Sequence, residues 1–338
     1  FGVAVVLLAI TLAVNGLSRL IIRRMQRTPA RSRAPGPLMQ AVHGLIPLSL
    51  PHRARRRIIH PKTTQKFAFL LISMGVVIVL AALGVILLEI IVKGAGAISL
   101  EFLTAPPSDL GRAGGIFPAI VGTLYLVAGA LAVALPLGIA TAIYLIEYTA
   151  DTWLTRGIRA AVDLLNGTPS IVFGLFGFAF LVLFLNFGVS LIAGQITLGL
   201  MILPTIIRTT EESLRSIPKS LREGSYALGA SKWQTVWRVV LPPALPGIIT
   251  GAILSIGRAA GETAPIMFTA AVFSSRYLPS SLFEPVMSLP YHLFILTTSV
   301  AGADDQKFGT ALVLLMMVLS IYLIAILVRH RYNRATVV

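Results

Sequence analysis

EGSYALGASKWQTVWRVVLP, residues 223–242, is the most specific stretch of this chain. Its apolar and aromatic residues recur at mixed three- and four-residue steps, which predicts two short amphipathic helices. Gly229 supplies the hinge between them, because glycine permits the left-handed backbone that ends a helix. Pro242 and Pro243 predict a break before the next segment. The unit suits a lever that docks into a groove of another protein, with an amphipathic loop on a lipid surface as the alternative.

Long apolar runs flank this stretch on both sides. Of 338 residues, 56% are apolar and 12% are charged, against about 45–50% and about 25% in soluble domains. A membrane helix takes about 20 apolar residues, and these runs are too long to be the strands of a membrane barrel. The sequence therefore predicts an all-α polytopic membrane protein. Its predicted spans are roughly 1–22, 67–92, 116–146, 164–187, 189–207, 246–273 and 308–328.

The basic residues lie mostly on one side of the predicted membrane. The formal net charge is +15, and the positive-inside rule makes the basic side cytoplasmic, including the C-terminus and the linker 23–66. The Arg-rich linker favours contact with anionic membrane lipid. Membrane topology thus accounts for the charge without a nucleic-acid partner. The opposite side carries Lys93, Arg112, Arg276 and Lys307.

The first predicted span resembles the last one. Residues 1–27 align without gaps on residues 308–334, and both begin with Phe-Gly and end in basic residues. We therefore expect residues 1–22 to be a transmembrane helix that ends a preceding, related membrane domain, to which the linker 23–66 joins the rest. An extra anchor helix is the alternative.

The sequence lacks the residues that several kinds of chemistry require. The chain has no Cys, which excludes disulfides, thiolate metal sites and cysteine nucleophiles. The five His lie in predicted linkers, loops or tails without a second ligand at metal spacing, so we expect no metal site. No stretch fits the phosphate-binding loop G-x-x-x-x-G-K-[ST], so this chain cannot hold the phosphates of ATP in that way. We expect no catalytic residues and no cofactor on this chain.

Charged residues four apart occur at the ends of two spans. Glu89 and Lys93 share a helix face at a predicted outer end, and Arg159 and Asp163 share one at a predicted inner end. Oppositely charged side chains at this spacing attract each other on a helix surface. Both pairs are therefore predicted to be interfacial ion pairs.

A third charged pair lies inside a predicted span. RAAGETAP, residues 258–265, places Arg258 and Glu262 on one helical face. Charges within the membrane normally face a bundle interior or a water-filled path. One interpretation is an ion pair that only fixes helix packing. The other is an anion site on the substrate path, because the rigid fork of Arg suits phosphate oxygens while Glu262 keeps the empty site neutral.

The spacing in the stretch 223–242 resembles the EAA loop of binding-protein-dependent ABC importer permeases, which engages the ATP-binding subunit. Glu223 is followed six residues later by Gly229, and twelve residues after that by Leu241 and Pro242. The two residues after Glu223 are Gly and Ser where the family usually has two Ala. The resemblance implies that the cytoplasmic segment 208–243 contains the ATPase-coupling loop.

RAAGETAP, together with NGTPSIVFGLFG at 166–177, resembles the PstA-type permease subunit of the phosphate ABC importer. The resemblance runs from about residue 67 to the C-terminus. It implies a six-helix type I ABC importer transmembrane domain over 67–338, with the helix 1–22 as an addition resembling the tail of a partner permease. Implied partners are a second related permease, two ATP-binding subunits and an extracytoplasmic phosphate-binding protein. The second motif contributes helix packing or path residues, namely Gly167, Pro169, Gly174 and Gly177.

The sequence thus predicts a permease subunit of an ATP-driven importer of inorganic phosphate in the cytoplasmic membrane, with Arg258 and Glu262 on its substrate path. The nearest alternative is a permease of the same loop class for another oxyanion such as molybdate or sulfate. A more distant alternative is an intramembrane scaffold or enzyme that uses the charged pair structurally.

Overall fold

The computed structural model describes residues 61–335. The predicted helix 1–22 and nearly all of the linker 23–66 lie outside the described residues. The described residues divide into two units, 61–88 and 89–335. Within the described residues, five helices are long and apolar enough to cross a membrane, or six if one bent pair is counted as a span.

Helix α3 (Pro61–Ala95) contains the first described span, Ile72–Ala95. This confirms the predicted span 67–92. Near its end the Nζ atom of Lys93 lies 2.6 Å from Oε1 of Glu89, so this predicted ion pair is confirmed. Lys93 also stands 4.8 Å from the centre of the Phe308 ring, a cation–π contact.

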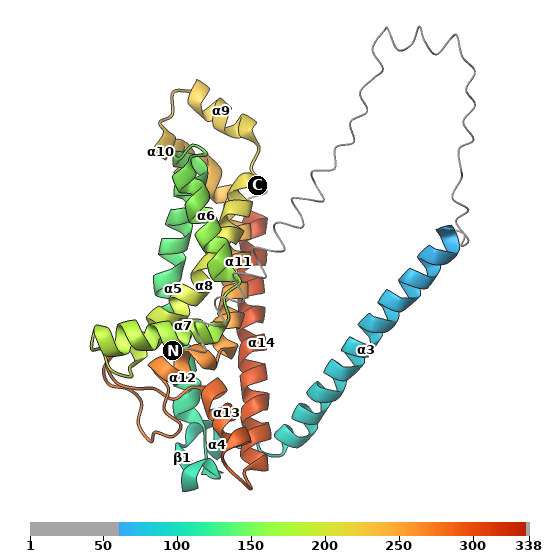
Figure 1. Ribbon diagram of the computed structural model, residues 1–338, viewed down its shortest axis with the longest axis vertical. Helices are drawn as coiled ribbons and strands as arrows, with labels where there is room; N and C mark the ends of the chain where they lie inside the picture. Colours follow the sequence, from blue (N-terminus) through green and yellow to red (C-terminus); the bar gives the residue numbers. More distant parts are fainter. Residues whose placement is uncertain (1–60, 336–338) are drawn as a thin grey trace, which may run out of the picture. The chain divides into compact units, whose positions relative to one another are not determined.

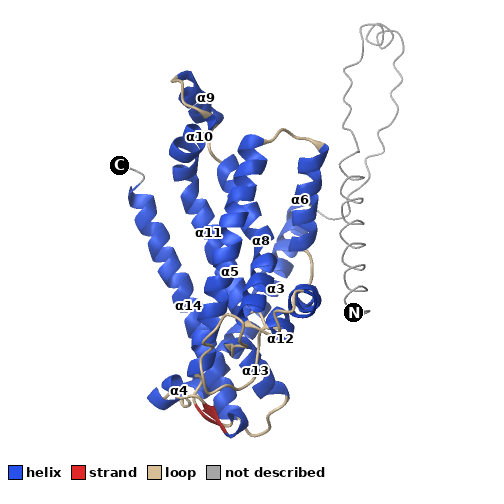
Figure 2. Ribbon diagram, turned by 90° about the vertical axis from the view of Figure 1, so that its left-hand side faces the viewer, coloured by secondary structure: helices blue, strands red, loops and turns tan. Residues whose placement is uncertain are grey.

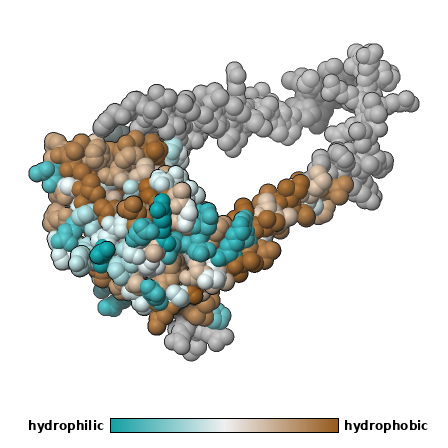
Figure 3. All heavy atoms as spheres, turned by 90° about the horizontal axis from the view of Figure 1, so that it is seen from below, coloured by the Kyte–Doolittle hydropathy of each residue, from teal (hydrophilic) through white to brown (hydrophobic). Residues whose placement is uncertain are grey.

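The second unit is a bundle whose long helices run side by side (Figures 1 and 2). Its centre is the packing of α5 on α8, with buried side chains such as Leu126 and Ile202 between them. One end carries short elements, and hydrophilic residues gather on that face (Figure 3). The elements of this unit up to α8 are α4 (Leu100–Thr104), β1 (Pro107–Ser108), η1 (Asp109–Gly111), β2 (Ala113–Gly114), α5 (Phe117–Ile143), η2 (Tyr144–Tyr148), α6 (Trp153–Asn166), α7 (Ser170–Gly177), η3 (Phe178–Phe184) and α8 (Leu191–Arg215). The strands β1 and β2 pair antiparallel, with Pro107 opposite Gly114.

The predicted span 164–187 is not one straight helix, because the chain turns sharply near its start. Helix α6 and the helix formed by α7 and η3 meet at a bend of 103°. Pro169 stands at the corner as the N-cap of α7, with φ −58° and ψ 140°. Proline lacks a backbone N–H and disfavours a helical residue before it, so α6 cannot continue through this position. Pro169, which the sequence analysis listed as a packing or path residue within this span, thus forms the corner between two helices.

Beyond α8 the chain forms the loop and the second half of the bundle. The elements are α9 (Lys219–Ala227), α10 (Lys232–Thr235), η4 (Val236–Val240), α11 (Leu241–Gly261), α12 (Ala264–Thr269), α13 (Leu289–Thr298) and α14 (Asp304–Ala335). Helix α8 reaches Arg215, so the segment between spans is shorter than the predicted 208–243. The span predicted at 246–273 also ends early, because α11 stops at Gly261.

The break predicted at Pro242 and Pro243 is absent. Residues 232–261 form one helical run long enough to span the membrane. Its segment η4 is π-helical, and the two prolines follow in the first turn of α11. Within a helical run a proline removes a backbone N–H donor, and the π-helical turn just before the two prolines is where the hydrogen-bond pattern changes. The π-helical turn thus lets the loop helix continue directly into the membrane.

Candidate functional site

The loop between α8 and α11 has the predicted helix–glycine–helix form. Helix α9 ends beside Gly229, whose φ of +82° is the left-handed conformation expected of the hinge. Helix α10 begins at once with a capping box between Ser231 and Gln234. Because each cap uses residues next to the hinge, the local sequence alone sets the turn between the two helices.

Aromatic and apolar side chains of this loop project away from the bundle. Helix α9 buries none of its residues, and Leu228 is 90% exposed and Trp233 62% exposed. The rings of Trp233 and Trp237 lie 5.1 Å apart. The loop stands at the end of the bundle opposite α4 and β1 (Figure 1). Apolar surface of this kind on a projecting element is typical of a site that contacts another protein or a membrane surface.

The four predicted coupling residues divide into two groups. Glu223 and Gly229 are exposed on the loop itself. Leu241 packs against the core cluster at the base of the loop, where α11 begins, and Pro242 lies in the first turn of that helix. The first group is thus open to a partner, while the second connects the loop to the membrane helix.

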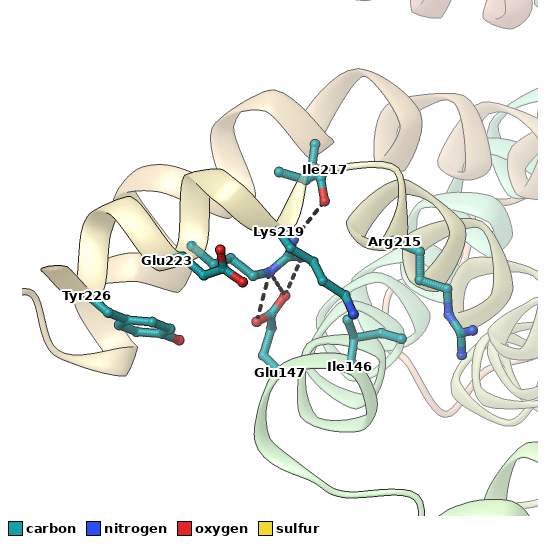
Figure 4. A pocket seen from close by; sticks show the side chains of 8 residues that line it. Ile146, Glu147, Arg215, Ile217, Lys219, Glu223 and Tyr226 are labelled. Atoms are coloured by element: carbon teal, nitrogen blue, oxygen red, sulfur yellow. Dashed lines mark hydrogen bonds and ion pairs between the residues drawn. The ribbon is translucent and has the colours of Figure 1, made fainter.

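A buried ion pair that the sequence analysis missed anchors the loop. Arg222 of α9 contacts Glu147 of η2 through Nη2–Oε1 at 2.7 Å and Nε–Oε1 at 3.1 Å (Figure 4). The two side chains are 15% and 5% exposed. They line a cavity of about 380 Å³ together with Glu223 and Tyr226, among others. The sequence analysis identified Glu223 from the spacing of its motif. It could not identify Glu147, which lies 75 residues from Arg222 in the chain.

A second charged cluster joins α6 to α8. Glu211 is 3% exposed, and its carboxylate lies 3.2 Å from Nε of Arg159 and 3.3 Å from Nη1 of Arg208. Arg208 also pairs with Asp163. The predicted pair of Arg159 with Asp163 is therefore wrong, since each finds its partner on α8. The buried carboxylate of Glu211 thus has one Arg partner on its own helix and one on α6, and together they balance its charge.

Arg258 and Glu262 lie at the junction of α11 and α12. Arg258 is in the last turn of α11, and Glu262 is the extended residue that follows the helix, with ψ 133°. The prediction that both share one helical face is wrong, yet the side chains still meet, with Nε and Oε1 3.7 Å apart. This separation exceeds a hydrogen bond. Within residues 61–335, Glu262 is the only ionic partner of Arg258, and its guanidinium donates no hydrogen bond to this part of the chain.

The two motifs RAAGETAP and NGTPSIVFGLFG pack against each other. A Cβ atom at Gly174 would lie 2.8 Å from the Ala264 carbonyl oxygen and 2.9 Å from Cα of Pro265, and one at Gly177 would clash with Thr197. These glycines therefore let α7 approach α12 and α8 closely. Gly167 caps the C-terminus of α6 instead, next to the corner at Pro169.

Replacing Gly174 with Ala should destabilise the bundle. The added methyl group would clash with backbone atoms, which cannot rotate away as a flexible side chain can, and overpacking of this kind costs about 1–3 kcal/mol. The measurement is the thermal unfolding midpoint of the purified permease. Gly157→Ala is the matched control, because a Cβ there meets nothing within 4 Å and should stabilise α6 by about 0.5–1 kcal/mol. Equal midpoints for the two variants would contradict the close contact.

His292 is buried in α13, although the sequence suggested an exposed loop. Its ring stacks on Phe273 with centroids 5.2 Å apart, and Nδ1 lies 3.0 Å from the Phe273 carbonyl oxygen. Burial lowers the pKa of this imidazole, and the hydrogen bond to the carbonyl only partly opposes that effect. Over the described residues 61–335, no group of three or more His, Asp or Glu is arranged to hold a metal ion.

Comparison with known proteins identifies the family. Residues 134–336 match the family described as binding-protein-dependent transport system inner membrane component. The "Probable ABC transporter permease protein YqgI" of Bacillus subtilis is 33% identical over 271 residues, which are 76% of this chain and 92% of that protein. The "Phosphate transport system permease protein PstA" of Yersinia pestis is 39% identical over 247 residues, or 72% and 81% of the two chains. "Phosphate transport system permease protein PstA 1" of Mycobacterium tuberculosis H37Rv is 41% identical over 224 residues, or 66% and 72%.

Solved structures show the same fold. A bacterial ABC transporter that imports the acidic polysaccharide alginate matches with a TM-score of 0.59 at 16% identity, covering 80% of this chain and 96% of that one. The inward-facing MetNI methionine ABC transporter matches with a TM-score of 0.51 at 20% identity, covering 64% and 94%. The fold is that of a type I ABC importer transmembrane domain, as predicted. The chain therefore belongs to the binding-protein-dependent transport system inner membrane components, and it is an ABC importer permease of the cytoplasmic membrane.

Proposed function

We propose that this permease imports inorganic phosphate and is driven by two separate ATP-binding subunits, which supply the ATP and Mg that this chain has no motif to bind. A second, related permease would complete the path, and an extracytoplasmic phosphate-binding protein would deliver the anion. Support for the cargo comes from the phosphate permeases of Yersinia pestis and Mycobacterium tuberculosis, which are 39% and 41% identical to this chain. Family membership favours transport over an intramembrane scaffold or enzyme.

The observation that carries the proposal is the free guanidinium fork of Arg258. Arg222 donates hydrogen bonds from all three of its nitrogens, whereas Arg258 donates none within residues 61–335 and faces Glu262 at 3.7 Å. An unused fork in a partly exposed position can take two oxygens of a tetrahedral anion. Glu262 then balances the charge when the anion is absent.

Coupling to the ATPases would run through the exposed loop. Trp233 and Leu228 offer apolar anchors, and Glu223 and Gly229 lie on the same projecting unit. Docked against a groove of an ATP-binding subunit, this surface would move when that subunit closes on ATP. The proposal places this end of the bundle in the cytoplasm with the linker 23–66 and the C-terminus, in agreement with the positive-inside rule.

Uptake by the reconstituted importer tests the cargo. We expect ATP-dependent accumulation of radiolabelled phosphate in vesicles that contain the permease, its co-purified ATPases and its binding protein. Unlabelled phosphate should compete at least about tenfold better than sulfate or molybdate, a difference of about 1.4 kcal/mol. Preferential competition by sulfate or molybdate would assign the permease to that oxyanion instead.

A further inference from the structure

The coupling loop contacts the rest of the bundle in three ways. Val236 and Val240 pack in an apolar core cluster, Nζ of Lys232 lies 5.2 Å from the centre of the Tyr148 ring, and Arg222 of α9 pairs with Glu147. Helix α9 buries no residue of its own, and the hydrogen bond between Ser225 and Thr235, at 2.8 Å, ties the two loop helices only to each other. The ion pair of Arg222 with Glu147 leads instead to η2, the direct continuation of α5. The ion pair therefore connects α9 to the helix at the centre of the bundle, beside the apolar packing of Val236 and Val240.

Arg222 joins three elements at once. Its Nη2 donates to Oε1 of Glu147 and, at 2.8 Å, to the carbonyl oxygen of Leu214 in the last turn of α8. Its Nη1 donates at 2.8 Å to the carbonyl oxygen of Ile217, in the turn before α9. The carbonyls at a helix C-terminus lack helical partners, so this guanidinium also caps α8. Only a planar fork with several donors can hold all of these acceptors together.

We propose that Glu147 and Arg222 are positioning residues that transmit movement of the docked loop to α5. This inference rests on the proposed docking of an ATPase to the loop. A buried, bidentate pair resists both separation and tilting, because either movement would leave a charge without a partner in a medium of low dielectric. When the ATPase moves α9, the pair moves η2 and α5 with it, and α5 packs directly on α8 at the core.

The other buried charge cluster does not offer this connection. Glu211 and its two Arg partners link α6 to α8, and neither helix belongs to the projecting loop. Glu223, next to Arg222 in α9, is exposed and remains available to a docking partner. Two adjacent residues of α9 thus face in different directions. Arg222 binds the membrane domain, whereas Glu223 is exposed to solvent.

The test compares ATP hydrolysis with phosphate uptake in reconstituted vesicles. In Glu147→Gln and Arg222→Lys we expect ATPase co-purification and hydrolysis to persist, while the ATP hydrolysed per phosphate imported rises about tenfold. Coupling free energies between protein sites are typically worth about 5- to 150-fold, and this estimate lies within that range. Arg156→Gln is the matched control, because its ion pair with Asp151 is exposed and 4.0 Å long, and the ratio should stay unchanged.

Cross-linking positions 147 and 222 distinguishes a positioning role of the ion pair from a role in stability alone. The chain has no Cys, so Glu147→Cys combined with Arg222→Cys gives a permease with two thiols. A short thiol-reactive linker between them should lower the ATP-to-phosphate ratio back toward that of the unaltered protein. If the linker restores nothing, or if assembly, hydrolysis and uptake fall together in every variant, the positioning role is overturned. If the unaltered permease retains no ATPase, both this role and the proposed coupling are overturned.

Discussion

Replacing Arg258 with Gln should nearly abolish phosphate uptake while leaving the importer assembled. The variant removes the fork that would replace the lost hydration of the anion, and a hydrogen bond to a charged group is worth about 1.5–3 kcal/mol, so uptake should fall by about 10- to 100-fold. Stability should change little, because the pair with Glu262 is long and its side chains are 33% and 19% exposed. Partly exposed ion pairs contribute about 0–1 kcal/mol. The measurement is uptake by vesicles matched for assembled complex.

Companion variants separate transport from packing at this site. Arg258→Lys keeps the charge without the fork and should retain an intermediate rate. Glu262→Gln should slow turnover without preventing entry, because an unbalanced Arg258 holds the anion longer. If the double Gln variant assembles normally and still imports phosphate at the normal rate, the pair has no role in the path and serves packing alone.

Replacing Gly229 with Val should weaken binding of the ATPase to the loop and thereby reduce uptake. Gly229 has φ +82° and free space around it, so the penalty comes from the backbone, at about 1–2 kcal/mol or more for a branched side chain. The turn would relax toward negative φ, and α10 with Trp233 would no longer be aimed at the ATPase. ATPase pull-down and uptake should both fall by about tenfold or more.

Gly224 provides a close control for this variant. It lies in α9 of the same loop, and a Cβ there also meets nothing within 4 Å. Gly224→Ala should leave pull-down and uptake unchanged, since helical backbone accepts alanine. If Gly229→Val behaves like Gly224→Ala, the left-handed turn is not needed for docking.

The prolines show which structural features can be predicted from local sequence and which cannot. Pro169 was predicted to be a packing or path residue inside a span, and the structure places it at the corner between two helices. Pro242 and Pro243 were read as a break, and the helix continues through them after a π-helical turn. A proline determines which hydrogen bonds are lost, whereas the neighbouring helices determine whether the chain bends there. Span boundaries were therefore the part of the fold that the sequence predicted least well.

The site residues divide in the same way. Gly229 was predicted correctly because its conformation depends on the sterics of a few adjacent residues. Arg258 and Glu262 were recognised as a pair from their spacing. The helix ends between them, and the extended backbone at Glu262 still leaves the two side chains 3.7 Å apart. Glu147 could not be recognised, because a lone Glu at the end of a span gives no indication of its partner.

The sequence by itself determined the membrane class, the order of the described spans and the helix–glycine–helix loop. Each of these depends on short-range properties: the hydropathy of about 20 consecutive residues and the backbone freedom of single ones. Only the tertiary structure decided the pairing of Glu147 with Arg222, of Arg159 with Glu211, and the packing of Gly174 on α12. Those contacts join residues that are far apart in the chain, and electrostatic attraction and close packing depend on distance in space, which no local pattern records.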